Sequence, residues 1–319
     1  MLTIKNHLTI PLLLGLSLCL NTYAYDFIKV EREQQGEAFS GKYEIVIEHD
    51  QALTSHTIYR PTNLSDGQHP VVVWGEGGCV DAGMMFPEFL SELASHGIVI
   101  VADGPPINMA QARAARQAGA NGGNDAVSGE TNEGTAERRR PPFIEPDGTD
   151  LITGLDWISE QNKTQGSRFY QKLNLNKVAA MGMSCGGLMA YGASSDPRIT
   201  TVGIWNSGLL RPDEKIYADL HSSIIIITGD DSDVAYPNGK RDFETINPDL
   251  PIFYGYAPGV GHGGTYGQDN GGIFGQVGVA WLRWQLLGDE SATGKGFFVG
   301  DTCAVCDNEQ WVIQSRSLD

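Results

Sequence analysis

Three polar residues in distant parts of the chain have the residue types and local settings that nucleophilic catalysis requires. Ser184 lies at the centre of the pentapeptide GMSCG at 182–186, after an apolar run at 177–181 and before a helical pattern at 187–193. In such a strand-turn-helix setting the glycines permit a tight turn, which exposes the serine hydroxyl and directs helix N–H groups toward it. Ser184 is therefore the candidate nucleophile.

A carboxylate that could orient a histidine follows another apolar run. The segment IIIIT at 224–228 leads into GDDSDVA at 229–235, which places acidic side chains where a buried strand ends. A catalytic triad needs one carboxylate at that position to orient the imidazole and to stabilise its cationic form. Asp233 is the first choice and Asp231 the second. The remaining acidic residues are expected to cap the loop, and their spacing matches no known calcium loop.

A histidine between glycines completes the set. His262 lies in GVGHGG at 259–264, directly after the last expected strand at 251–254. A general base must reach the serine hydroxyl and pass its proton to the leaving group, and a histidine on a turn at the same sheet edge can do both. Packing or surface roles are expected for the other histidines of the chain after the leader, which are His49, His56, His69, His96 and His221.

The elements that must position these residues follow from the hydropathy pattern. Continuous apolar runs bounded by glycine are typical of a parallel sheet that is buried on both faces, and helical patterns lie between several of them. We therefore expect one doubly wound α/β domain with a mostly parallel sheet and helices on both faces. The expected strands are 43–48, 55–59, 70–74, 97–102, 177–181, 201–205, 223–228 and 251–254, and the expected helices are 86–95, 149–161, 187–193 and 271–287.

Composition excludes several other classes of protein. With 319 residues, 41% of them hydrophobic and 19% charged, the chain is typical of globular proteins and long enough for one large domain. The net charge of −17 argues against nucleic acid as a partner. The segment at 75–77 is not a dinucleotide loop, because Val80 occupies the position of the third glycine, and no P-loop is found. We expect no cofactor and no metal.

The first 24 residues have the three parts of a secretory signal peptide. One cation, Lys5, precedes an apolar stretch at 8–20 that is too short to span a membrane, and small residues at 22 and 24 fit a cleavage site. A lipoprotein anchor at Cys19 is a weaker alternative. The mature chain, 25–319, has no further apolar run of spanning length, so we expect a secreted or periplasmic domain without a membrane span.

Export makes four cysteines candidates for two disulfides. Cys79, Cys185, Cys303 and Cys306 allow three connectivities in an oxidising compartment. The last two form a C-x-x-C, for which zinc or redox roles are the alternatives to a structural bond.

A further irregular feature is the segment 105–147, which is unusually long for a connection and is expected to be either a solvated insertion or a lid over the site. It contains the only arginine run, at 138–140.

The chain resembles the α/β-hydrolase superfamily over its mature length. The motifs that carry the resemblance are WGEGGC, ASHGIVIVADG, GMSCGG, DVAYPNG, VGHGGTY and WLRWQLLGD, and the order serine, aspartate, histidine is the one found in that superfamily. More locally the chain resembles secreted serine esterases near the dienelactone-hydrolase branch and the polyester- and carbohydrate-esterase branches. This resemblance implies an acyl-enzyme mechanism at Ser184 with Asp233 and His262.

The same resemblance implies where the oxyanion hole lies. Its two donors are expected to be the backbone N–H of Cys185 and that of Glu76, with Gly77 as the alternative to Glu76. If Cys79 ends that loop, a disulfide to Cys185 would join both donor segments and leave Cys303 to pair with Cys306. The alternative is that Cys185 is a small buried apolar residue.

The expected function is hydrolysis of carboxylic esters, either small or part of a polysaccharide or polyester. A serine peptidase of the same fold and a non-catalytic binding module with this fold are the alternatives. Trp205, Tyr236 and Tyr266 follow strands or catalytic turns, and each is expected either to line the cleft or to pack at the edge of the sheet.

Overall fold

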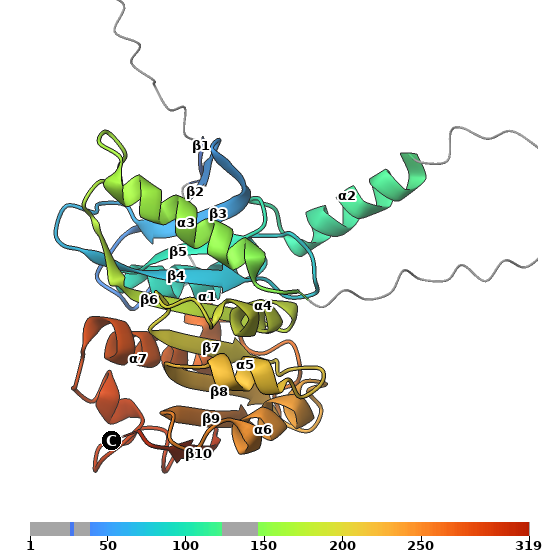
Figure 1. Ribbon diagram of the computed structural model, residues 1–319, viewed down its shortest axis with the longest axis vertical. Coiled ribbons are helices and arrows are strands. Elements are labelled where there is room, and N and C mark those ends of the chain that lie inside the picture. The colour runs from blue at the N-terminus through green and yellow to red at the C-terminus, as the bar shows by residue number, and fades with distance from the viewer. Residues whose placement is uncertain (1–25, 29–38, 123–145, 319) are drawn as a thin grey trace, which may run out of the picture.

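A computed structural model describes residues 26–28, 39–122 and 146–318 of the chain (Figure 1). Ten strands form a single sheet in the order β1-β2-β3-β5-β4-β6-β7-β8-β9-β10. The strands are β1 (Asp26–Ile28), β2 (Ile45–Asp50), β3 (Leu53–Pro61), β4 (His69–Gly75), β5 (Val99–Asp103), β6 (Leu173–Met183), β7 (Thr201–Trp205), β8 (Ser223–Gly229), β9 (Ile252–Ala257) and β10 (Val312–Arg316).

The centre of the sheet is parallel and its edges are antiparallel. Strands β5, β4, β6, β7, β8 and β9 pair in parallel, whereas β1 to β3 at one edge and β10 at the other pair antiparallel. All residues of β7 and β8 are buried, as the runs of β-branched residues in these strands predict for a sheet that is covered on both faces.

Helices cover both faces of this sheet (Figure 1). On one face lie α1 (Pro87–Ser95) and α7 (Gly272–Leu287), and on the other lie α3 (Thr149–Lys163), α4 (Cys185–Ala193), α5 (Glu214–Asp219) and α6 (Tyr236–Thr245). Phe274, Val277 and Trp281 of α7 recur at three- and four-residue spacing and are fully buried, so the helix presents one apolar stripe to the sheet. Short 3-10 turns occur at η1 (Asp269–Gly271) and η2 (Lys295–Phe297).

The α/β class, the mostly parallel sheet and the expected strands and helices agree with the sequence analysis. The structure adds β1, β10, α5 and α6, and it places a helix, α2 (Met109–Gly122), at the start of the segment 105–147, whose expected role as an insertion or a lid stays a prediction. Figure 1 shows α2 projecting away from the sheet. The expected signal peptide at 1–24 and the arginines at 138–140 lie outside the described residues.

Parallel pairing brings the functional candidates to one edge of the sheet. The strands β4, β6, β8 and β9 all end at this edge, and the loops that follow them carry the residues singled out above. In such sheets the crevice at the carboxyl ends of the strands is where ligands bind.

Candidate active site

Ser184 occupies a strained turn between β6 and α4. Its φ is +54°, a left-handed value that non-glycine residues rarely adopt and that costs on the order of 1–3 kcal/mol. Glycines on both sides allow close packing, since a Cβ on Gly186 would lie 1.8 Å from the carbonyl oxygen of Gly75. The Ser184 N–H donates to the Trp205 carbonyl at 2.9 Å, and the Ser207 hydroxyl donates to the Ser184 carbonyl at 2.7 Å.

The structure brings Ser184, His262 and Asp233 into one hydrogen-bonded chain. His262 Nε2 lies 3.0 Å from Ser184 Oγ, and His262 Nδ1 lies 2.6 Å from Asp233 Oδ1. The carboxylate accepts from Nδ1–H, which leaves Nε2 free to accept the serine proton. The His262 side chain is 35% exposed while that of Asp233 is fully buried, so the imidazole is accessible to solvent and is held by a buried carboxylate.

Asp233 is held as a carboxylate by donors on both of its oxygens. Besides His262, the backbone N–H of Ala235 donates to Oδ1 at 2.9 Å, and the N–H of Gly229 donates to Oδ2 at 2.9 Å. Burial raises the pKa of the Asp233 carboxyl, but the hydrogen bonds to its charged form outweigh burial and leave the pKa below its ordinary value. Asp231, the second candidate, is exposed and has no contact with the histidine.

Asp230 holds the loop that carries His262. Asp230 accepts a hydrogen bond from the Gly259 N–H on one carboxylate oxygen at 2.6 Å, and its own N–H donates to the Val260 carbonyl at 2.9 Å. These bonds join the loop after β8 to the loop after β9. Because His262 lies only two residues beyond Val260, the loop contacts restrict the positions from which its imidazole can approach Ser184.

Two further residues extend the chain of hydrogen bonds behind Asp233. The Asn206 side chain donates to Asp233 Oδ2 at 2.7 Å, and it accepts from the Tyr266 hydroxyl at 2.5 Å. Asn206 is fully buried with a φ of +40°, so its amide is held where water does not compete. The sequence analysis missed Asn206. The only signal was an asparagine directly after the end of β7, and asparagine is one of the few residues that tolerate this backbone conformation.

The aromatic residues considered as cleft walls lie elsewhere. Trp205 and Tyr266 are buried, and both rings pack at 5.2 Å from Phe89 between the sheet and α1. Tyr236 is half-buried and packs edge-on against Tyr256. Of the two roles expected for these three residues, the structure shows packing, and Tyr266 also donates the hydrogen bond to Asn206 described above.

The candidate oxyanion loop packs directly on the serine turn. Glu76 and Gly77 follow β4, and a Cβ on Gly77 would lie 2.6 Å from the Met183 sulfur, next to Ser184. Cys185 is the first residue of α4, so its N–H has no acceptor within the helix and is available to an external oxygen. The Glu76 side chain points away from water, with an exposed fraction of 2%.

Both disulfides follow the expected pairing. Cys79 pairs with Cys185, with their Cα atoms 5.2 Å apart, and Cys303 pairs with Cys306 at 5.4 Å. The first bond ties the loop after β4 to the residue that follows Ser184. Cys303 and Cys306 are thus joined to each other, which is the structural alternative for the C-x-x-C.

Comparison with models of known protein families and with curated protein sequences gives no match. Within residues 26–28, 39–122 and 146–318, no cluster of three or more His, Cys, Asp or Glu side chains is placed to hold a metal ion. Across the same part of the chain, the helices are too short or too polar to cross a membrane.

Proposed function

We propose that the protein is a secreted serine hydrolase of the α/β-hydrolase superfamily that cleaves carboxylic esters through an acyl-enzyme intermediate. The observation that carries this proposal is the contact of His262 with both Ser184 Oγ at 3.0 Å and Asp233 Oδ1 at 2.6 Å. A nucleophile within hydrogen-bond reach of a base, which is itself oriented by a third group, is the geometry of activated nucleophiles.

In the acylation step, Ser184 Oγ attacks the carbonyl carbon of the ester while its proton passes to His262 Nε2. The carbonyl oxygen becomes an oxyanion, and the new imidazolium is stabilised by the Asp233 carboxylate. When the tetrahedral intermediate collapses, the bond to the leaving alcohol breaks and His262 returns the proton to the alcohol oxygen. Water then repeats the sequence on the acyl-enzyme and releases the acid.

The oxyanion of both steps is assigned to the backbone N–H groups of Cys185 and Glu76. The Cys79–Cys185 disulfide joins the two segments that carry these donors, so it holds them in place before substrate arrives. Preorganised donors of this kind are effective because they need no rearrangement during the reaction, and losing one costs on the order of 100-fold to 1000-fold in kcat.

The proposed location is the periplasm or the extracellular space. Two disulfides among the described residues are consistent with an oxidising compartment, and the pattern at 1–24 is that of a signal peptide. The choice of esters as substrate class is supported by the resemblance of the motifs around 74–79, 182–187 and 260–266 to those of secreted esterases.

A hydrolysis panel tests the proposed function. The purified protein is assayed with p-nitrophenyl acetate, butyrate and octanoate, acetylated xylan, methyl ferulate and a peptide p-nitroanilide, beside its Ser184→Ala variant. We expect turnover of at least one ester, no turnover of any ester by the variant, and little or no cleavage of the amide. Equal activity in the variant would exclude Ser184 as the nucleophile, and faster cleavage of the amide would replace the esterase with a peptidase.

A further inference from the structure

A second feature of the same sheet edge is a cavity of about 150 Å³ beside the serine turn. It lies where β4 and β5 end and α3 begins, and the Cys79–Cys185 disulfide forms part of its wall. Cys185 directly follows Ser184, and consecutive Cα atoms are separated by about 3.8 Å. A group bound in this cavity could therefore belong to the same substrate molecule whose ester carbonyl is held at Ser184.

Carboxylates dominate the charged lining of this cavity. They come from the loop after β4, the end of β5 and the start of α3, and they are Glu76, Asp81, Asp103, Asp147 and Asp150. Glu76 is 98% buried, and its carboxylate oxygens accept no hydrogen bond of ordinary geometry among the described residues, although the Trp74 indole N–H lies near enough to favour the charged form. Asp103 is also buried, whereas the other three are exposed at the rim. In the described part of the chain no ion pair involves any of the five.

Among the described residues, the basic groups near the cavity make no ion pair with these carboxylates. The Arg116 guanidinium donates a hydrogen bond to the Cys79 carbonyl instead. His56 on β3 is paired opposite Asp103, but its Nε2 contacts the Asp150 carbonyl, and burial lowers the pKa of the imidazole, which keeps it neutral at pH 7.

Burial and the neighbouring charges shift the pKa values of the two buried carboxyl groups. Burial raises the pKa of the Glu76 carboxyl well above its ordinary value. Burial together with the charges of Asp150 and Asp81 raises the pKa of Asp103 to about 7. A cationic ligand would reverse this effect, because an opposite charge nearby favours the ionised form of a carboxyl group.

The size and geometry of the cavity favour an organic cation over a metal ion. The carboxylates of the described residues do not form a group of three placed to hold a metal. The volume of about 150 Å³ is several times the roughly 30 Å³ that one water occupies in the liquid, which is room for a methylated ammonium group.

We propose that this cavity binds the substituted ammonium group of an ester substrate, so that the protein selects cationic esters over neutral esters of the same shape. This inference rests on the proposed function, since it deepens the specificity of the same site. The buried Glu76 and Asp103 form the floor, and Asp81, Asp147 and Asp150 attract the cation from the rim.

Two pairs of isosteric esters test the inference, one for each side of the scissile bond. On the alcohol side, acetylcholine is compared with 3,3-dimethylbutyl acetate. On the acyl side, the p-nitrophenyl ester of 4-(trimethylammonio)butyrate is compared with that of 5,5-dimethylhexanoate. In each pair a quaternary nitrogen replaces a quaternary carbon, so shape is matched and only charge differs. We expect at least one pair to show a kcat/KM ratio on the order of tenfold or more in favour of the cation.

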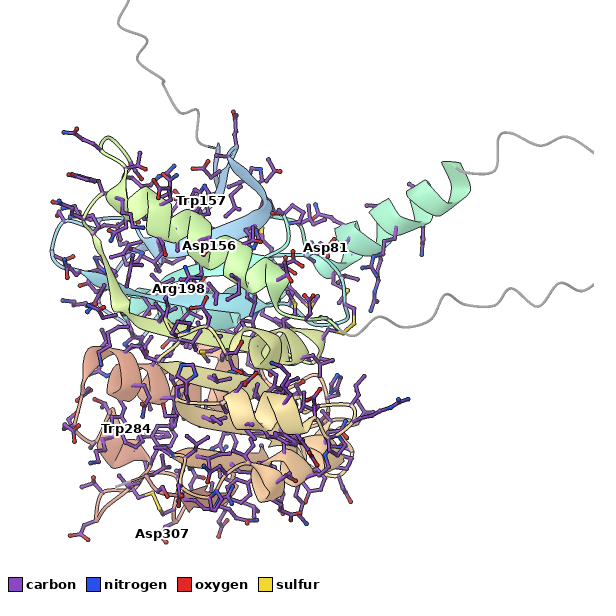
Figure 2. All side chains as sticks on the ribbon, viewed as in Figure 1. Asp81, Asp156, Trp157, Arg198, Trp284 and Asp307 are labelled. Atoms are coloured by element: carbon purple, nitrogen blue, oxygen red, sulfur yellow. A yellow bond between two sulfur atoms is a disulfide. The ribbon has the colours of Figure 1, made fainter. Side chains whose placement is uncertain are left out.

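Variants locate the source of that preference. Asp81→Asn removes an exposed charge at the rim and is expected to lower the ratio severalfold, through a loss of kcat/KM for the cationic ester. Asp307→Asn is the matched control, because Asp307 is also exposed and lies at the lower end of the molecule in Figure 2, whereas Asp81 lies in the upper half. It makes the same change in net charge and is expected to leave the ratio unchanged.

The pH dependence of the ratio gives a second readout. Effects of pH on the chemical step that the two esters of a pair share cancel in the ratio. We expect the ratio to rise between pH 6 and pH 8 as Asp103 ionises beside Glu76, Asp81 and Asp150, and Asp103→Asn to abolish the rise. Ratios near one in both pairs, with the neutral esters still hydrolysed, would overturn the inference and leave the proposed function standing. Hydrolysis of no ester at all, p-nitrophenyl acetate included, would overturn both.

Discussion

The two disulfides differ in the length of chain that they close, and this difference yields a quantitative prediction. Cys79 and Cys185 are separated by 106 positions, whereas Cys303 and Cys306 are separated by 3. The loss of loop-closure entropy in the unfolded chain predicts a stabilisation of about 4.8 kcal/mol for the long loop and about 1.9 kcal/mol for the short one. The perturbation is therefore a pair of double variants, Cys79→Ala/Cys185→Ala and Cys303→Ala/Cys306→Ala.

The first double variant is expected to lose more stability and, in addition, activity. A difference of about 3 kcal/mol in the free energy of unfolding corresponds to roughly 5 °C in Tm for a domain of this size. Without the disulfide, the loop after β4 keeps its packing on the serine turn at Gly75 and Gly77 but loses its covalent link, so kcat is expected to fall on the order of 10-fold to 100-fold, below the full cost of losing one oxyanion donor. The second double variant is expected to keep its kcat.

The assay is the Tm from thermal unfolding together with kcat for p-nitrophenyl butyrate at 25 °C, where all three proteins are folded. Reduction of the unmodified protein with a phosphine provides an independent route to the same state. Equal losses of Tm in the two double variants would refute the loop-closure reasoning. A full kcat in Cys79→Ala/Cys185→Ala would refute the role of the bond in holding the oxyanion loop.

Three further predictions follow from single contacts. Tyr266→Phe removes the donor that fixes the Asn206 amide, and kcat for an ester is expected to fall on the order of tenfold with little change in KM; an unchanged kcat contradicts this. Asp103→Asn tests the raised pKa of that carboxyl, which is about 7 in the folded protein against an ordinary 3.8. The protonated carboxyl therefore contributes to the free energy of unfolding in full below pH 3.8, and this contribution is lost as pH rises through 7. Tm should accordingly fall from pH 5 to pH 8 more steeply in the unmodified protein than in the variant. Gly186→Ala places a Cβ 1.8 Å from the Gly75 carbonyl oxygen and is expected to lower Tm by several degrees and abolish hydrolysis, whereas Gly267→Ala, whose Cβ meets no atom within 4 Å, should change neither.

The placement of the candidate triad could be predicted because it depends on local motifs and one topological rule. Ser184, Asp233 and His262 each follow a strand that is recognisable from its apolar run. Once those strands are parallel, their carboxyl ends meet at one edge, so three local patterns are enough to bring the side chains together. The disulfide between Cys79 and Cys185 was expected only through the resemblance to α/β-hydrolases, which places both cysteines beside the oxyanion hole; the order of the sheet agrees with it, because β4 and β6 are neighbours.

Other parts of the site and fold depend on long-range contacts that leave weak local signals. Asn206 contacts Asp233 and Tyr266 only through tertiary structure, and no motif surrounds it. Helix α6 begins with Tyr-Pro-Asn-Gly, a sequence typical of a turn, but its buried Asp242 accepts hydrogen bonds from the Leu209 N–H and the Tyr217 hydroxyl. Strand β10 is a largely exposed edge strand without a continuous apolar run. In each case tertiary contacts outweigh weak local propensity.

The buried carboxyl of Glu76 was also beyond prediction from the sequence. Its position after β4 identified a backbone donor, but a glutamate in a glycine-rich loop is ordinarily expected to be exposed. The cavity that Glu76 lines is completed by the segments around 79–81 and 146–150, which are far apart in the chain.

The central claim is that Ser184 is a nucleophile activated by His262, and covalent labelling measures this directly. Intact-mass spectrometry after treatment with a fluorophosphonate should show one adduct per chain, located on Ser184 by peptide mapping. Ser184→Ala should show none, and His262→Ala should label at least 100-fold more slowly while retaining the Tm of the unmodified protein within a few degrees. An unlabelled protein, or a Ser184→Ala variant that labels at the original rate, would contradict the account.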